Sequence, residues 1–441
     1  MVVTMNVFAR GCRLLCWAGV FLLATMALAQ VEAERQLQDP DAKLRERAAR
    51  ELGERGNPAY VPVLGTAVQD ADEKVRMSVV KSLIRLDTEA SLEPLCLAVR
   101  DGIPEIRYLA IDGIVNFYLP GYVDTGFGGF FRSVSGRVEA LFSDVDAVVA
   151  DPDIRINETA LRTLRQSLTG APDMRTRVRA ARALGILRAR QAIPDLIEAL
   201  YFNNVELTDE ILRAFQKIKD TSVGPRIVFL LSYPHEEIKR AAATTLGLLQ
   251  TESAIPDLRQ LFENSRDNKT RIAALDALAF MPQQQTAPLF VQYLDDREKE
   301  LRASAALGLG RLQDLGYLGP LQQQRDKERD ARVRLALAFA LVANGQLDYL
   351  PELVADLTSR TRRGEARPYL VELAREEAVR EALRPHLYST DAAIRKNLCQ
   401  VYAASGNSTS ISYLEVLLRD RDAEVVQEAS RAIRILRSKG F

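Results

Sequence analysis

The sequence predicts an all-α protein of the α-solenoid class, a right-handed superhelix of about a dozen antiparallel helix pairs. Two observations predict it. A branched apolar residue followed by Arg or Lys returns about every 31 residues, and each unit holds two short amphipathic helical patterns. Single compact cores stop growing at about 250 to 300 residues, whereas stacked repeats can extend one core along a chain of 441 residues.

The recurring dipeptide lies near the start of the first helix of each unit. Clear copies are Leu44-Arg45, Val75-Arg76, Ile106-Arg107, Val178-Arg179, Ile238-Lys239, Leu301-Arg302, Val333-Arg334 and Ile394-Arg395, and weaker copies begin at Leu207, Thr270 and Val425. Aspartates precede many of these starts, and we expect them to cap free N–H groups of the first helix: Asp70, Asp101, Asp173, Asp391 and Asp422.

Proline marks the expected start of the second helix of a unit. Pro194, Pro256, Pro288 and Pro351 follow the first helix closely, and proline suits the first turn of a helix because it lacks an N–H. The apolar spacing of the two helices predicts that one set of leucines is buried between neighbouring repeats: Leu184, Leu196, Leu246 and Leu258.

The clearest copy runs from Val178 to Leu187 as Val-Arg-Ala-Ala-Arg-Ala-Leu-Gly-Ile-Leu and continues as Ala192-Ile193-Pro194-Asp195-Leu196. This unit resembles the bacterial HEAT-like repeat of the phycobilisome-lyase type, and the resemblance covers roughly residues 38–436. It implies a superhelix that binds partners, but no single activity. Deoxyhypusine hydroxylases also use HEAT-like repeats, yet their iron site needs several His-Glu pairs and only His235-Glu236 occurs here.

Residues 1–29 are typical of a secretory signal peptide. Arg10 and Arg13 precede an uncharged apolar run from Leu14 to Leu28, which ends in the small-residue pattern Ala27-Leu28-Ala29. The alternative, a membrane anchor, needs about 20 apolar residues. We therefore expect cleavage after Ala29 and a mature protein in the periplasm or the extracellular space.

Charge and cysteine content narrow the class of partner. Removal of the leader takes away two arginines and no acid, so the balance of 59 basic and 59 acidic residues turns slightly acidic. Nucleic-acid binding usually requires a basic excess, so a nucleic-acid partner is disfavoured. Beyond the leader only Cys96 and Cys399 remain, about ten repeats apart, and we expect both to be free and buried.

One region breaks the period. After Ile106 the next matching start is Ile154-Arg155, a step of 48 residues, which divides the mature chain into repeats at 30–117, an insertion at 118–136 and repeats at 137–441. The insertion sets Tyr122, Phe127, Phe130 and Phe131 among glycines. These rings either pack on the irregular seam, which we favour, or form a patch that binds a protein or a membrane surface.

A second irregular spot is the arginine run at Arg360, Arg362, Arg363 and Arg367, interpreted as an inter-repeat loop. It is either a solvated turn or a site for an acidic partner, because guanidinium groups suit carboxylates and phosphates.

The sequence assigns no catalytic residue, cofactor or metal site. The only histidines, His235 and His386, lie about five repeats apart, too far to build a paired metal site. The leading hypothesis is a non-catalytic protein-protein interaction scaffold of the cell envelope or extracellular space, with a protein partner of unknown identity. The alternatives are a lyase or other enzyme subunit built on HEAT-like repeats, and a peripheral membrane adaptor that uses the aromatic insertion.

Overall fold

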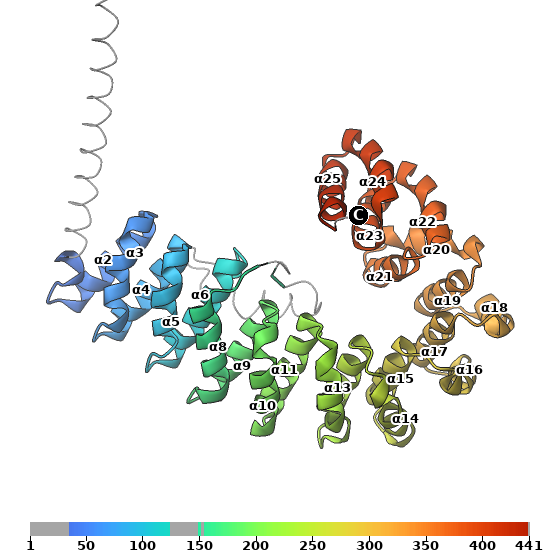
Figure 1. Cartoon of the computed structure of the whole chain (residues 1–441), viewed down its shortest axis with the longest axis horizontal. Helices are drawn as coiled ribbons and strands as arrows, with labels where there is room; N and C mark the ends of the chain where they lie inside the picture. The colour runs from blue at the N-terminus through green and yellow to red at the C-terminus, as the bar shows by residue number, and fades with distance from the viewer. Residues whose placement is uncertain (1–34, 124–148, 151–153, 440–441) are drawn as a thin grey trace, which may run out of the picture. The chain divides into compact units, whose positions relative to one another are not determined.

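The computed structural model describes residues 35–123, 149–150 and 154–439 (Figure 1). Every regular element in these ranges is a helix or a short 3-10 turn. The chain divides into two units, Met1–Arg226 and Ile227–Phe441, and each is described by itself. The predicted leader, 1–29, lies outside the described residues.

The N-terminal unit is a stack of two-helix repeats. Its first helices are α2 (Ala42–Glu54), α4 (Glu73–Leu86), α6 (Pro104–Tyr118), α9 (Met174–Ile186) and α11 (Val205–Ile218). Its second helices are α3 (Val61–Thr66), α5 (Leu92–Ala98), α8 (Glu158–Gly170) and α10 (Ile193–Ala199), and α12 (Gly224–Ile227) spans the boundary of the unit. Each first helix packs on the next, which forms one continuous row.

The C-terminal unit repeats this arrangement. Its first row is α13 (Glu236–Leu248), α15 (Asn268–Phe280), α17 (Lys299–Leu312), α19 (Ala331–Ala343), α21 (Arg363–Leu373), α23 (Ala392–Ser405) and α25 (Ala423–Ser438). Its second row is η7 (Val228–Ser232), α14 (Ile255–Asn264), α16 (Ala287–Tyr293), α18 (Leu318–Lys327), α20 (Leu350–Ala355), α22 (Glu377–Leu383) and α24 (Ser408–Glu415), the last continued by η14 (Val416–Arg419). Within this unit the first row lies on the inner side of the curve (Figure 1). The α-solenoid prediction is confirmed.

Local sequence signals set the helix boundaries. Asp173, Asp391 and Asp422 are the N-caps of α9, α23 and α25 and accept backbone N–H groups, as predicted. The prediction was wrong for Asp70 and Asp101. The N-caps of α4 and α6 lie two residues later, at Asp72 and Ile103. The four prolines singled out from the sequence lie in the first turns of α10, α14, α16 and α20, which confirms how the second helices begin.

The predicted core positions are buried. Leu184, Leu196, Leu246 and Leu258 are all fully shielded from solvent. Cys96 and Cys399 are free and buried, and burial raises the pKa of the Cys399 thiol to about 12. The four buried leucines thus lie in the core that neighbouring repeats share.

The glycine of the Ala-Leu-Gly motif allows first-row helices to approach closely. A Cβ atom at Gly247 would lie 2.7 Å from Cα of Ala277 on the next first helix, and one at Gly310 would lie 2.6 Å from Cα of Ala340. These glycines stand twelve residues after the N-caps of α13 and α17, facing the following repeat. The glycine of the motif thus permits the close spacing between neighbouring first-row helices.

We expect Gly310→Ala to destabilise the C-terminal unit by about 1 to 3 kcal/mol, because the new methyl group meets the backbone of Ala340 and the helices must shift. Gly319→Ala is the matched control. Gly319 lies in α18 with open space around it, so the same substitution should be neutral or stabilise by up to about 1 kcal/mol. Thermal unfolding of both variants checks this, and equal effects would contradict the close-approach argument.

The last described first-row helix, α25, lacks the glycine of the motif. Arg434 occupies the position in α25 that is Gly247 in α13 and Gly310 in α17, twelve residues after the N-cap. Arg434 is exposed, as are Gln427 and Arg431 on the same helix. This face of α25 is therefore polar and exposed.

The structure corrects the interpretation of Ile154-Arg155 as a repeat start. These residues precede α8, and α8 packs on α5, α9 and α10, which is the place of a second-row helix. The repeat that begins with α6 therefore ends with α8, and the extra residues lie between its two helices. The predicted insertion at 118–136 falls outside the described residues from position 124 onward, so its extent stays a prediction.

Candidate binding surfaces

The arginine of the repeating dipeptide makes a specific connection between repeats, which we call the arginine clasp. Its guanidinium group binds backbone carbonyls in the turn before its own helix and forms two parallel bonds to a carboxylate in the next inter-repeat turn. Four described pairs share this two-bond geometry: Arg45–Asp70, Arg76–Asp101, Arg302–Glu328 and Arg395–Asp420. Asp70 and Asp101, expected as caps, are instead clasp acids.

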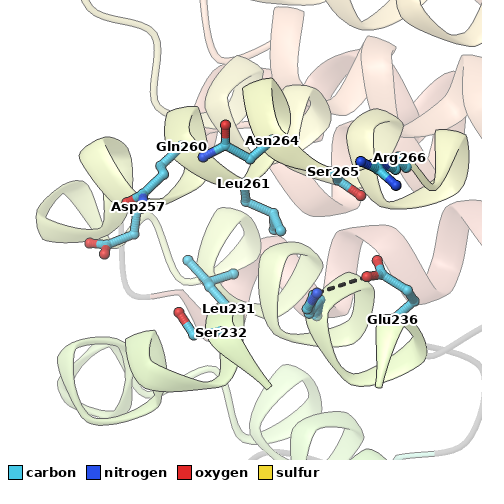
Figure 2. A pocket seen from close by; sticks show the side chains of 10 residues that line it. Leu231, Ser232, Glu236, Asp257, Gln260, Leu261, Asn264, Ser265 and Arg266 are labelled. Atoms are coloured by element: carbon cyan, nitrogen blue, oxygen red, sulfur yellow. Dashed lines mark hydrogen bonds and ion pairs between the residues drawn. The ribbon is translucent and has the colours of Figure 1, made fainter. Parts of the chain in front are cut away.

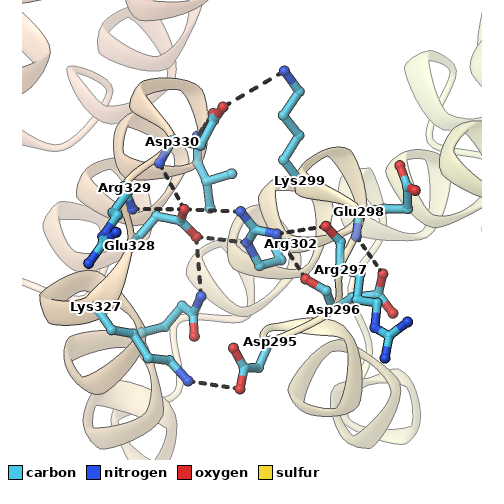
Figure 3. A network of polar contacts seen from close by, with 12 residues as sticks. Asp295, Asp296, Arg297, Glu298, Lys299, Arg302, Lys327, Glu328, Arg329 and Asp330 are labelled. Carbon is cyan, nitrogen blue, oxygen red and sulfur yellow. Dashed lines mark hydrogen bonds and ion pairs between the residues drawn. The ribbon is translucent and has the colours of Figure 1, made fainter.

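Figure 3 shows the clasp of Arg302 in detail. Nε and Nη2 of Arg302 donate to Glu328 at 2.7 and 3.0 Å, and Nη1 donates to the carbonyl oxygen of Asp296 at 2.8 Å. Burial opposes ionisation of Glu328, but the bonds from Arg302 and from the backbone N–H of Asp330 outweigh it and lower its pKa to about 2. The pair stays charged at neutral pH and joins α17 to the turn before α19.

A second polar cluster covers the first row of the N-terminal unit. Arg179 on α9 binds Asp112 on α6, and Arg182 on α9 binds Glu210 on α11 at 2.7 Å. Burial raises the pKa of Asp112, against the effect of Arg179. Tyr122, just after α6, lies near these groups, and burial followed by the charge of Asp112 raises the pKa of its hydroxyl. The cluster ties three successive first helices together.

Both described ends of the chain around residues 124–148 are attached to this same row. The N–H of Val123 donates to Oδ1 of Asn116 at 2.9 Å, and the N–H of Ala150 donates to the carbonyl oxygen of Ile186 at 2.8 Å. Val123 and Ala150 are buried. Val123 and Ala150 therefore lie against first-row helices α6 and α9.

Tyr122 is half-buried, and whether it serves packing or binding stays a prediction. Phe127, Phe130 and Phe131 lie outside the described residues, so the choice between packing and binding stays a prediction for them.

A hollow of about 1020 Å³ lies on the second-row side of the same repeat. Phe117 and Tyr118 at the end of α6 form one wall, and Arg155 and Arg162 line it beside α8. The N–H of Asn157 donates to the Tyr118 hydroxyl at 2.7 Å, which fixes the entry to α8. The hollow combines aromatic rings with guanidinium groups and could receive an aromatic or acidic side chain.

The predicted arginine loop is shorter than the sequence suggested, because α21 begins at Arg363. Arg363 and Arg367 are therefore helical, and Arg367 donates to Gln400 at 2.6 Å. Arg362 is held by Asp356 at 2.7 Å, whereas Arg360 and Arg363 are exposed. The structure separates the four arginines into two that are bound within the chain, Arg362 and Arg367, and two that face solvent, Arg360 and Arg363.

Sequence reasoning missed a cluster centred on Asp276 of α15. The Ser304 hydroxyl on α17 donates to Asp276, and Arg311 of α17 binds Glu372 of α21 at 2.8 and 2.9 Å while its guanidinium lies 4.4 Å from the Phe280 ring. Burial raises the pKa of Asp276 to about 6, although Ser304 and Arg311 oppose the rise. The sequence signal that could have revealed this cluster is an aspartate nine residues after an N-cap, a position that Asp276 shares with Asp112.

We expect Asp276→Asn to stabilise the protein at pH 7 by up to about 2 kcal/mol. A folded-state pKa above the unfolded value means that protonation favours the fold, so the native carboxyl contributes most below about pH 4 and loses that contribution as pH rises through about 6. The amide can donate to the Ser304 hydroxyl, which also bonds the Glu300 carbonyl oxygen.

Urea unfolding of wild type and Asp276→Asn from pH 4 to pH 8 checks this. The difference in unfolding free energy should grow with pH. Asp326→Asn, at an exposed aspartate of α18, is the control and should give no such trend. A constant difference would show that the Asp276 carboxyl is not titrating in this range.

Figure 2 shows a polar crevice of about 410 Å³ in the C-terminal unit, between η7, α13 and α14. Leu231 and Leu261 face each other across it, and Gln260 and Asn264 line its open side. Glu236 is already bound by Lys239 at 2.7 Å. The crevice is the seam between successive second-row elements.

Among residues 35–123, 149–150 and 154–439, no group of three or more His, Cys, Asp or Glu side chains could hold a metal ion. No helix in the described part of the chain has the length and apolarity needed to cross a membrane.

Comparison with known proteins identifies the repeat. The model for HEAT repeats matches residues 33–114, 203–279 and 260–342, and the model for the PBS lyase HEAT-like repeat matches 176–201. A search of the curated proteins gave no significant match.

Similar solved structures share low identity. An engineered protein is 20% identical, with 92% of this chain and 98% of that one covered and a TM-score of 0.34. The complex of CpcE and CpcF of phycocyanin lyase from Nostoc sp. is 18% identical over 59% of this chain and 92% of that one, with a TM-score of 0.35. Importin beta is 13% identical over 92% of this chain and 62% of its own, with a TM-score of 0.46. Because the HEAT-repeat model matches half of the sequence, in both units, the chain belongs to the HEAT-repeat family.

Proposed function

We propose that this HEAT-repeat protein is a binding scaffold for another protein, without catalytic chemistry of its own, and that it acts outside the cytoplasm. The observation that carries the proposal is the arginine clasp. The charged groups that recur in the motif bind one another between repeats, as in Arg76–Asp101 and Arg395–Asp420, where every side chain is at most 16% exposed. The repeated residues thus hold the stack, and the surface side chains that differ between repeats are available to partners.

The first-row face is the best candidate surface. We define it by the exposed side chains among those nine and thirteen residues after the first-helix N-caps, such as Thr244 and Leu248 of α13. Both are exposed, and Leu248 is 44% exposed, which is high for a leucine. In the C-terminal unit these helices form the inner side of the curve, where one partner can contact several repeats at once (Figure 1).

Affinity capture from the native envelope fraction tests the proposal. A double variant, Thr244→Glu with Leu248→Glu, should keep the thermal stability of the mature chain and lose the partner, since two new charges oppose burial in an interface. Gln260→Glu with Gln292→Glu places two charges on exposed second-row positions and should retain it. Equal capture by both double variants would exclude the first-row face.

The location is tested by the N-terminus of the native protein. We expect the mature chain to begin at or near Gln30, because the apolar run and the Ala27-Leu28-Ala29 pattern are typical of a leader that is cleaved. Mass spectrometry of the protein from its native source checks this, and an intact segment from Met1 to Ala29 would contradict it.

The second candidate, an enzyme subunit, has one observation in its favour. Asp276 has a pKa near neutrality and lies beside the Ser304 hydroxyl on the first row, and such shifts are common in acid–base catalysis. If Asp276→Asn removed a biological activity while partner capture persisted, this candidate would replace the scaffold proposal.

A further inference from the structure

The arginine clasp has a fixed position in the repeat. In all four clasps the arginine lies four residues after the N-cap of its own first-row helix. The acid lies two residues before the N-cap of the next first-row helix. These two positions can therefore be compared from one repeat to the next.

The junction between α19 and α21 differs from the clasp at both positions. Arg334 lies four residues after Asp330, the N-cap of α19. Arg360 lies two residues before Arg362, which occupies the N-cap position of α21. Both arginines are exposed, and neither side chain has a hydrogen bond or an ion pair with any described residue. A base thus stands at the position of the clasp acid, and its charge repels that of Arg334.

The other repeats that lack the two-bond clasp still hold the cation at this position. Each of these cations has a different contact within the chain, and the pairs are Arg107–Asp173, Arg177–Phe202, Lys239–Glu236 and Arg271–Tyr293. Among the first-row helices that the structure describes, Arg334 is the one cation at this position without such a contact. The junction before α21 is therefore different from the rest of the stack.

The acids on either side of this turn are already bound. The pairs are Asp356–Arg362 at 2.7 Å and Glu365–Arg332 at 2.6 Å. Arg363, the first residue of α21, is exposed and has no partner among the described residues. Arg334, Arg360 and Arg363 thus remain as charges that no carboxylate of the described chain neutralises.

We infer that Arg334, Arg360 and Arg363 form a binding site for an acidic segment of a partner protein, in which one carboxylate bonds Arg334 as a clasp acid bonds its arginine. A guanidinium group binds a carboxylate through two parallel bonds, and the four clasps show that this place in the repeat suits that geometry. Nucleic acid fits less well, because 59 basic against 59 acidic residues give no basic excess. The inference rests on the proposed scaffold function and specifies the chemistry of a second surface.

Two labelled peptides test the site. The probe alternates glutamate with serine, and the control peptide has glutamine in place of every glutamate. By fluorescence anisotropy the glutamate peptide should bind the chain and the glutamine peptide should not. Binding should weaken as salt is added, because salt screens exposed charges.

Arg360→Asp places an acid at the clasp position and should have two effects. It should weaken binding of the glutamate peptide by about tenfold or more, because the new carboxylate competes for Arg334 and repels the peptide. It should also raise the melting temperature by about 1 to 3 °C, the scale of one exposed ion pair. Arg334→Gln should weaken the peptide without this rise, and adding Arg334→Gln to Arg360→Asp should abolish the rise.

Arg297→Asp is the matched control. Arg297 is exposed in the turn before α17, and its side chain has no partner among the described residues (Figure 3). The substitution should leave peptide binding unchanged and should not raise the melting temperature. Circular dichroism should show equal helix content in all variants, because every substituted side chain is exposed.

The other outcomes overturn the inference. A rise in melting temperature that persists without Arg334 would show that the two positions do not meet. Equal binding of both peptides, or undiminished binding by Arg334→Gln, would remove the acidic site. Binding to phosphatidylserine vesicles but not to the peptide, lost in Arg360→Asp, would assign the surface to a membrane. The scaffold proposal can fail separately, because its test depends on Thr244 and Leu248.

Discussion

Arg395→Met should destabilise the C-terminal end of the stack by about 3 to 5 kcal/mol, the cost of leaving one member of a buried ion pair without its partner. The side chains of Arg395 and Asp420 are only 5% and 7% exposed, and the pair is joined by two bonds of 2.7 Å. Arg395 also donates to the carbonyl oxygen of Ser389 at 2.7 Å, so its removal leaves that group unbound as well.

A second substitution shows how much of this loss comes from the unpaired charge of Asp420. Arg395→Met with Asp420→Asn should recover part of the loss, because the amide is neutral and can still accept the N–H of Asp422. Arg47→Met is the control for an exposed pair, since Arg47 and Glu51 are 68% and 37% exposed, and it should cost less than about 1 kcal/mol.

The clasp should also be sensitive to acid. Arg395 lowers the pKa of Asp420, so the pair stabilises the fold above the unfolded-state pKa of that carboxyl and this stability is lost as pH falls through the folded-state value. The difference between wild type and Arg395→Met in urea unfolding should therefore shrink toward low pH. An equal difference at all pH values would mean that the lost stability is packing, not charge.

Leu246→Ala should cost about 2 to 5 kcal/mol locally, because Leu246 is fully buried between repeats and its truncation leaves a cavity. Stability in a solenoid is close to a sum of nearest-neighbour terms, so the loss of hydrogen-exchange protection should stay in α13 and the helices that pack on it. Leu248→Ala, two residues on and 44% exposed, is the matched control and should change protection little. Uniform loss of protection along the whole chain would show that the stack unfolds as one unit.

Much of the fold follows from local signals. Helix periodicity, the prolines at second-helix starts and aspartates such as Asp391 act within one turn of the residue concerned, so the sequence reveals them directly. The leucines at 184, 196, 246 and 258 were predicted to be buried for the same reason, and they are.

What the sequence did not reveal depends on contacts between repeats. Arg76 and Asp101 are 25 residues apart, and only the superposition of one repeat on the next brings them together. Asp70 was therefore assigned to the nearest helix, although its side chain reaches back to Arg45. Ile154-Arg155 matches the motif but precedes a second-row helix. A two-residue motif does not show whether the helix that follows it belongs to the first or the second row.

The placement of residues 119–157 between α6 and α8 has a topological consequence. α6 packs on α4, α5 and α9, and α8 packs on α5, α9 and α10, so α6 and α8 are positioned mainly by other helices and not by each other. The identity of a repeat is thus spatial and does not require an unbroken peptide between its two helices. The interval between α6 and α8 is therefore a point at which another module could be inserted while the packing of these helices on their neighbours is kept.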